Sequence, residues 1–401
     1  MRTAHRLPYR RTLTAVTAAL LGVALPVPPA GADDPTRCTF ASKPYPGRPW
    51  SLQRVLLDEL WRQSTGAGVR VAVIDTGVDI KNPQLKTAVD AGSGRSFLRG
   101  DPRDGTTDTV GHGTKVAGVI AAREAEGTGF TGLAPDATII PIRQNDARNN
   151  GTAATLAEAV HYAADTARAD VINISQDTSE AVASTPVLEQ AVNAALDRDI
   201  VIVASAGNDG LDGRVKKTYP ASYEGVLAVA ASDRDNERAA FSQSGDFVDV
   251  AAPGVDIVST VPGGGHCADS GTSFSAPYAA GVAALIRAKH PDWTRKQVVA
   301  QIEQTAERSV AGRDRLVGWG VVDPVRALTE DERPLERPVA QEGASGAEAP
   351  AAAAFHPGET ADERTTRLAT YAVTGVAVLV AALAGIAVAV RDGRRRTGDR
   401  T

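Results

Sequence analysis

Three separated segments carry residues that together could perform nucleophilic catalysis: an acid, an imidazole and a hydroxyl. Asp75 ends the apolar run 69–75, His112 stands in a Gly-His-Gly-Thr motif, and Ser273 stands in Gly-Thr-Ser. Serine becomes a nucleophile when a base takes its proton, and an imidazole base needs a carboxylate to fix its tautomer. The order Asp, His, Ser is one of the known chain orders for such a triad.

Each of the three residues also has an ordinary structural explanation when it is taken alone. An Asp before Thr-Gly often caps a turn, a single His is more often structural than catalytic, and a Ser at a helix start is often an N-cap. The three motifs in this order therefore favour catalysis more strongly than any one of them does.

The surrounding segments predict how these residues are positioned. Residues 69–75 form a short β-branched run typical of a buried parallel strand, which places Asp75 at its carboxyl end, where α/β sheets hold their sites. The histidine begins a small-residue helix. Ser273 begins another helix, where backbone N–H groups favour negative charge.

With these motifs the sequence resembles the subtilisin-like serine proteases. The matching residues are V-I-D-T-G around Asp75, H-G-T-x-V-A-G from position 112, and G-T-S-x-S-x-P from position 271, within a region of about 66–328. The resemblance implies an α/β fold with a doubly wound, mostly parallel sheet and helices on both faces. It implies that Ser273 is the nucleophile, His112 the general base and then acid, and Asp75 the residue that orients the imidazole.

The resemblance also implies the binding residues of the site. The segment 204–208 follows a predicted strand and matches the family's oxyanion segment, so the Asn208 amide would donate to the tetrahedral intermediate beside the Ser273 N–H. Gly207 and the edge segment after strand 170–174 are the expected substrate-binding residues. That edge segment consists of Ser175, Gln176 and Asp177.

Two positions depart from the family pattern. Asp177 stands where the family usually has Gly, which leads to the hypothesis that the pocket prefers basic residues; the alternative is that Asp177 points into solvent. Phe274 stands where many relatives have an oxidisable Met. Because Met1 is the only methionine, we expect activity to survive peroxide better than in those relatives.

Both ends of the chain carry targeting signals. Residues 1–32 combine a basic start, a short apolar run and Ala-Gly-Ala, which predicts a secretory signal peptide. Residues 368–390 are uncharged and about 34 Å long as a helix, enough to span a membrane. The basic tail 391–401 then favours a cytoplasmic C-terminus and an extracytoplasmic protease. Between them lie an N-terminal extension, 33–65, and an acidic Ala/Pro-rich linker, 329–367.

Cys38 and Cys267 are the only cysteines, and both lie in the exported portion. An even number of cysteines outside the cytoplasm favours a disulfide, with two unpaired buried thiols as the alternative. A bridge would pin the N-terminal extension a few residues ahead of Ser273.

Composition excludes other classes of function. With 43 Lys+Arg against 48 Asp+Glu, the net charge of −5 argues against nucleic-acid binding. The acidic stretch 101–108 contains Arg103 and is interpreted as a solvated loop, so no metal and no cofactor are expected.

The short extension, the Pro-containing linker and the single membrane helix resemble the mycosins, anchored subtilases that accompany type VII secretion systems. The resemblance implies a serine endopeptidase acting on protein or peptide substrates, with secretion membrane components as partners. The alternatives are a mainly structural component of the secretion complex and a general cell-surface subtilase.

Overall fold

The site depends on one parallel sheet. The computed structural model describes residues 38–100, 104–176, 186–340 and 361–398. Seven strands lie in the order β2-β3-β1-β4-β5-β6-β7, and every neighbouring pair is parallel. The strands are β1 (Arg70–Asp75), β2 (Arg95–Ser96), β3 (Thr138–Arg143), β4 (Val171–Ile174), β5 (Val201–Ser205), β6 (Leu227–Ser232) and β7 (Val250–Pro253).

Alternating side chains divide this sheet between two cores. In β1, Val71 and Val73 join one hydrophobic cluster, whereas Ala72 and Ile74 join the other. A strand buried on both faces reads as a continuous apolar run, because successive side chains point to opposite sides. Both faces must therefore be covered by helices.

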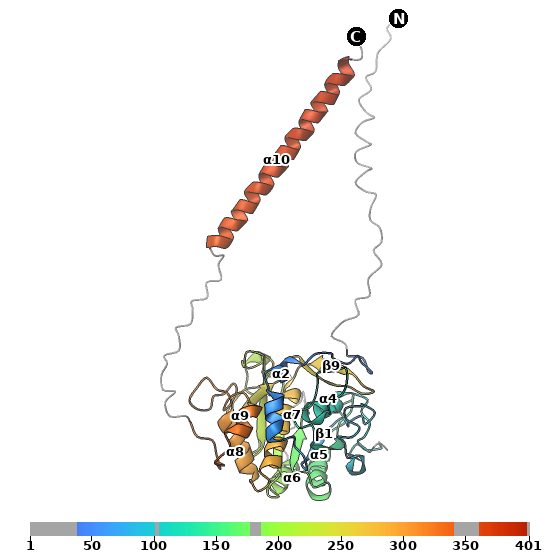
Figure 1. The fold of residues 1–401 in the computed structure, drawn as a ribbon, viewed down its shortest axis with the longest axis vertical. Helices are drawn as coiled ribbons and strands as arrows, with labels where there is room; N and C mark the ends of the chain where they lie inside the picture. Colours follow the sequence, from blue (N-terminus) through green and yellow to red (C-terminus); the bar gives the residue numbers. More distant parts are fainter. Residues whose placement is uncertain (1–37, 101–103, 177–185, 341–360, 399–401) are drawn as a thin grey trace. The chain divides into compact units, whose positions relative to one another are not determined.

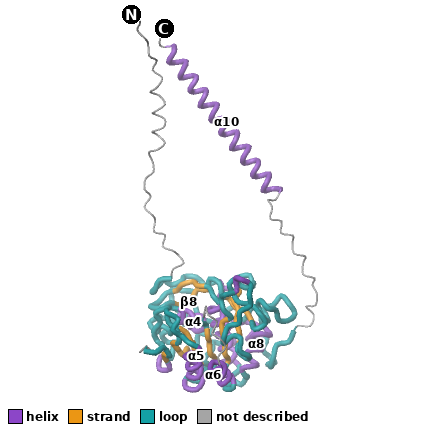
Figure 2. Tube along the Cα trace, turned by 180° about the vertical axis from the view of Figure 1, so that it is seen from behind, coloured by secondary structure: helices purple, strands orange, loops and turns teal. Residues whose placement is uncertain are grey.

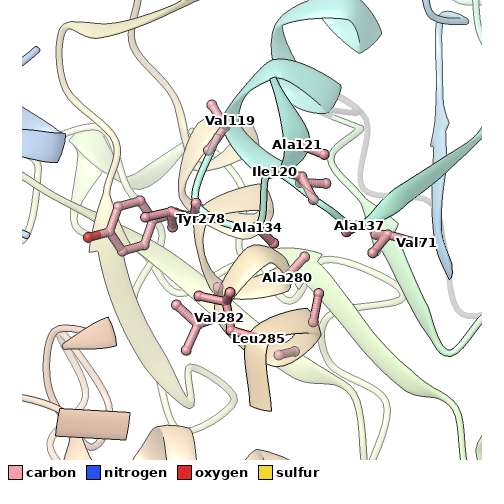
Figure 3. Packing of buried hydrophobic residues seen from close by; sticks show 14 of the residues in the cluster. Val71, Val119, Ile120, Ala121, Ala134, Ala137, Tyr278, Ala280, Val282 and Leu285 are labelled. Atoms are coloured by element: carbon pink, nitrogen blue, oxygen red, sulfur yellow. The ribbon is translucent and has the colours of Figure 1, made fainter. Parts of the chain in front are cut away.

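Helices cover both faces, as Figures 1 and 2 show. The central helix α7 (Thr272–Lys289) packs across β4, β5, β6 and β7, and α4 (His112–Ala121) packs on α7 and β1. Small residues allow the close packing of the two helices in Figure 3, where Ala280 and Ala121 are labelled. The opposite face is covered by α5 (Ala153–His161) and α6 (Pro186–Leu196). On the face that α7 covers, two further helices pack against α7: α8 (Arg295–Thr305) and α9 (Pro324–Thr329). The predicted doubly wound α/β fold is confirmed.

The described part of the N-terminal extension belongs to the same folded unit. It contains α2 (Trp50–Gln53) and α3 (Leu57–Gln63). Leu57 and Leu60 are buried in the same core, and α3 packs against α9. An antiparallel hairpin of β8 (Ile257–Thr260) and β9 (His266–Asp269) packs on α4. The chain of the extension runs beside β9, where the amide of His266 donates to the carbonyl of Lys43.

The C-terminal segment forms a second unit. Its helix α10 (Ala361–Gly398) is long and apolar enough over Arg364–Arg391 to cross a membrane, and it contains the predicted span 368–390. The predicted signal peptide, 1–32, lies outside the described residues.

Candidate active site

The structure places Asp75 and His112 in direct contact. Asp75 ends β1 and is buried, and His112 is the first residue of α4. Their Oδ1 and Nδ1 atoms lie 2.8 Å apart, and the amide of Thr76 also donates to Asp75 Oδ1. Burial of the imidazole lowers the pKa of His112, but the charge and hydrogen bond of Asp75 outweigh this and hold the pKa above its ordinary value. With Nδ1 held by Asp75, Nε2 is the ring atom that can exchange a proton with another group.

A buried carboxylate, Asp108, organises the segment that leads into His112. Oδ1 of Asp108 accepts hydrogen bonds from the hydroxyl of Thr76 at 2.9 Å and from the amides of Val110 and Gly111. Its Oδ2 accepts from the amide and hydroxyl of Thr114. Burial raises the pKa of Asp108, against the lowering effect of these hydrogen bonds.

The interpretation of 101–108 as a solvated loop is therefore wrong at Asp108, which is only 6% exposed. Residues 101–103 lie outside the described residues. Among the described residues there is no cluster of His, Cys, Asp or Glu that could hold a metal ion. A sequence signal for Asp108 did exist: it is an acid four residues before a helix-starting His, where orphan helix N–H groups need acceptors.

A second buried charge supports the same two loops. Arg143 ends β3 and is fully buried, and its Nη1 donates to the carbonyl of Thr76 at 2.6 Å and to that of Thr107 at 3.2 Å. These carbonyls belong to the residues directly after Asp75 and directly before Asp108. Arg143 thus ties together the loop after the acid and the loop before the histidine. Sequence reasoning missed it because nothing in a β-strand pattern marks the residue that reaches across the sheet edge.

Ser273 lies in the first turn of α7 and is almost fully buried. The ring of its neighbour Phe274 lies beside His112, with ring centroids 5.5 Å apart. This contact brings the start of α7 to the imidazole. At a helix N-terminus, unpaired backbone N–H groups can stabilise an anion that forms on a bound carbonyl.

Asn208 is attached to the same helix start. Its Oδ1 accepts from the amide of Thr272 at 2.9 Å and from the Thr272 hydroxyl at 3.0 Å. The amide of Gly207 in turn donates to the Thr272 hydroxyl. These bonds fix the plane of the Asn208 amide, so that its nitrogen is on the side away from the Thr272 contacts. Sequence reasoning did not single out Thr272, whose role depends on residues more than 60 positions away.

The expected edge segment is described in part. Ser175 and Gln176 follow the carboxyl end of β4, and Ser175 is buried with its hydroxyl accepting from the side chain of Asn173. Asp177 lies outside the described residues, so the hypothesis of a basic preference stays a prediction.

The disulfide between Cys38 and Cys267 is present, which confirms the predicted pairing. It joins the extension to β9, two residues before Asp269. The carboxylate of Asp269 forms an ion pair of 2.6 Å with Lys115 of α4, three residues after His112. The extension, the hairpin and the histidine helix are therefore linked.

Comparison with known proteins identifies relatives of this arrangement. The profile of the subtilase family matches residues 66–320. The M-protease of Shouchella clausii (strain KSM-K16) is 38% identical over 276 residues, covering 69% of this chain and 68% of that protein. Mycosin-4 of Mycobacterium tuberculosis (strain ATCC 25618 / H37Rv) is 39% identical over 356 residues, covering 78% and 76% respectively.

The solved structures that this chain resembles include several mycosin proteases. MycP1 with its N-terminal propeptide removed is 34% identical, with a TM-score of 0.65, covering 72% of this chain and 100% of that one. MycP3, described as a protease from the type VII (ESX-3) secretion system, is 37% identical, with a TM-score of 0.64, covering 74% and 92%. Another MycP1 structure, 33% identical with a TM-score of 0.64, covers 73% and 91%; its description calls MycP1 an essential component of the type VII (ESX-1) secretion system.

Proposed function

The chain belongs to the subtilase family of serine proteases, and we propose that it is a membrane-anchored endopeptidase whose acyl-enzyme forms on Ser273. The observation that carries the proposal is the contact of His112 with both Asp75 and the Ser273 segment. The imidazole is held by a buried carboxylate on one side and lies against Phe274 on the other. An imidazole held by a carboxylate beside the Ser273 segment supports activation of that hydroxyl as a nucleophile.

The chemistry follows from these positions. Nε2 of His112 takes the Ser273 proton as Oγ attacks the scissile carbonyl carbon, and the carbonyl oxygen becomes an oxyanion. The C–N bond then breaks, and His112 gives its proton to the departing amine. Water repeats the sequence on the acyl-enzyme and releases the carboxylic acid. Asp75 keeps the tautomer and stabilises the imidazolium without itself taking the proton.

Asn208 would stabilise the oxyanion. Its amide plane is fixed by Thr272 before substrate arrives, so little reorganisation is needed when charge develops. The amide of Ser273, at the helix start, would be the second donor. Loss of such an amide donor costs about 10²–10³ in kcat, a figure measured in a subtilisin.

Catalysis is tested with the full-length chain in detergent. A fluorophosphonate probe should label the wild-type enzyme at Ser273, and Ser273→Ala should abolish both labelling and hydrolysis of a casein substrate. Ser275→Ala, two residues along the same helix, is the matched control and should keep labelling. Wild-type protein that is folded but neither labelled nor active would refute the proposal.

The location belongs to the same proposal. The helix over Arg364–Arg391 would anchor the protein, with the basic tail inside and the catalytic domain outside the cytoplasm. Similarity to Mycosin-4, MycP1 and MycP3 supports a role in type VII secretion, with components of the secretion membrane complex as partners. The orientation is tested with epitope tags placed in the linker and at the C-terminus. In intact cells, added protease should remove the linker tag and leave the C-terminal tag.

A structural role in the secretion complex is the second candidate function. It is favoured by the description of the related MycP1 as an essential component of its secretion system. A strain that produces only the Ser273→Ala protein separates the two. Secretion that persists without cleavage supports the structural role, and secretion that stops with cleavage supports the enzymatic one. Normal secretion in a strain that lacks the gene would exclude both roles in secretion and would support the third alternative, a general cell-surface protease.

A further inference from the structure

The N-terminal extension places an exposed aromatic ring next to the histidine segment. The tip of the Phe40 ring lies directly over Gly111, so that a Cβ at position 111 would overlap it. Gly111 has a φ of 85°, and it is followed by His112. The absence of a side chain therefore allows both the left-handed backbone and the close approach of the ring. Phe40 nevertheless remains 43% exposed.

This ring is held in place by the chain around it. Cys38, two residues earlier, is bonded to Cys267 of β9. Beyond Phe40, the amide of Ser42 donates to the carbonyl of Gly264 at 3.0 Å, and the amide of Tyr45 donates to His266 Nδ1 at 3.0 Å. The segment 38–45 is therefore tied to the β8–β9 hairpin on both sides of the ring, and the entropy cost of ordering Phe40 is met before substrate binds.

The position of the ring assigns it to one half of the substrate. His112 returns its proton to the leaving amine, so the leaving half of the substrate departs past the imidazole and the helix that His112 begins. The hairpin packs on this helix, α4, and segment 38–45 is tied to the hairpin. The acyl half is expected along Ser175 and Gln176, which follow β4 in the main sheet.

Two charges on the elements that flank the extension, β9 and α4, compensate one another. Asp269, at the end of β9 and 45% exposed in its side chain, pairs with Lys115. The Lys115 ammonium also lies 5.8 Å from the centroid of the Phe274 ring. With this ion pair compensated, the exposed phenyl ring of Phe40 offers dispersion and apolar burial to a substrate rather than a net charge.

We propose that Phe40 is a specificity-determining residue that contacts the substrate side chain directly after the scissile bond and favours an apolar residue there. The extension is then a wall of the substrate cleft. This inference rests on the proposed peptidase function of the same site, and it adds the class of substrate residue that the leaving half should carry.

The test uses the full-length enzyme and internally quenched peptides that differ only in the residue after the scissile bond: Leu, Ser, Asp or Lys. The wild type should have a higher kcat/KM for Leu than for Ser. Phe40→Ala should reduce this Leu/Ser ratio by about tenfold, which corresponds to the loss of roughly 1.4 kcal/mol of apolar contact. Phe40→Lys should raise the Asp/Leu ratio, a gain that loss of folding cannot produce.

Tyr45→Ala is the matched control, because Tyr45 lies in the same segment and is similarly exposed at 39%. Its Leu/Ser ratio should stay within about twofold of the wild type. An unchanged ratio in Phe40→Ala together with an unchanged Asp/Leu ratio in Phe40→Lys would overturn the inference, as would an equal loss in Tyr45→Ala. Failure of the proposed function looks different: the wild type would then not react with fluorophosphonate at all.

Discussion

Two groups of buried acids in the catalytic unit differ in how their charge is satisfied. Around the histidine, Asp108 accepts five hydrogen bonds from backbone amides and threonine hydroxyls. Around α8, Glu303 is 8% exposed, and its pKa is raised to about 8 by burial and by the nearby Asp249, against the weaker effect of two arginines. The half-buried Asp249, which pairs with Arg313 at 3.0 Å and accepts from the amide of Ala228, has its own pKa raised to about 6 by burial.

The difference shows that burial alone does not identify a functional acid. Hydrogen bonds to a carboxylate stabilise its charged form and fix the segments that donate them. Burial raises the pKa of Asp108 as well, but at Glu303 the charge of Asp249 adds to the effect of burial, so that ionisation of Glu303 lowers stability. We therefore expect substitutions near His112 to affect catalysis, and substitutions near α8 to affect stability.

The largest effect is expected at the acid that contacts the imidazole. Asp75→Asn should keep the fold but reduce kcat by about 10⁴, because an amide presents a donor and stabilises the wrong tautomer of His112. The measurement is kcat on a quenched peptide, with thermal unfolding as a check. Asp136→Asn, which alters a surface ion pair with Arg123, should leave kcat unchanged. Retention of more than about a tenth of wild-type kcat in Asp75→Asn would contradict the proposed role.

The next effect is expected at Asp108. Asp108→Ala leaves several buried N–H groups without an acceptor, which should cost about 3–5 kcal/mol of stability and displace the start of α4. We expect kcat to fall by about 10- to 100-fold in the protein that remains folded. The matched control is Asp104→Ala in the same loop, where the carboxylate accepts from the amide and hydroxyl of Thr106, two residues along the chain. Equal effects of the two substitutions would show that Asp108 has no special relation to His112.

Substitution of Glu303 should raise the stability of the protein, whereas substitution of Asp108 should lower it. The folded-state pKa of Glu303 is about 8 against an ordinary 4.5, so the contribution of this group to stability is full in acid and is lost as the pH rises from 4.5 through 8. Glu303→Gln should therefore raise the free energy of unfolding by about 2–3 kcal/mol at pH 9 and change it little near pH 4.5. Thermal unfolding in a Ser273→Ala background, which prevents autolysis, measures this.

The control for that experiment is Glu307→Gln, since Glu307 is exposed and paired with Arg54. It should give no gain in stability at pH 9. A wild-type protein whose stability does not fall between pH 5 and 8 relative to Glu303→Gln would show that Glu303 ionises normally.

The smallest effect is expected from the charge at Lys115. Its ammonium lowers the pKa of His112, whereas Asp75 and Asp108 raise it. Lys115→Gln should therefore shift the acidic limb of the kcat/KM profile to higher pH, with little change at the plateau. Lys81→Gln, an exposed lysine, serves as the control. A shift to lower pH would show that the substitution acts by displacing Asp269 rather than by removing charge near the imidazole.

Much of this molecule follows from local sequence pattern. Apolar β-branched runs predict the strands, and the motifs around Asp75, His112 and Ser273 place three chemical groups at element ends. The length of the uncharged stretch 368–390 predicts a membrane-spanning helix, and the even number of cysteines predicts a disulfide. These features were predictable because strand alternation, helix starts and membrane spans depend on residues close together in the chain.

The supporting shell of the site could not be predicted in the same way. Thr272 holds Asn208 across 64 positions, Arg143 reaches the loop of Thr76 across 67, and Phe40 meets Gly111 from the extension. Asp108 and Glu303 are both acids whose pKa is raised by burial in the folded chain. Which of them receives hydrogen bonds and which is only desolvated depends on the segments packed around it, and that packing exists only once the sheet and its helices have come together.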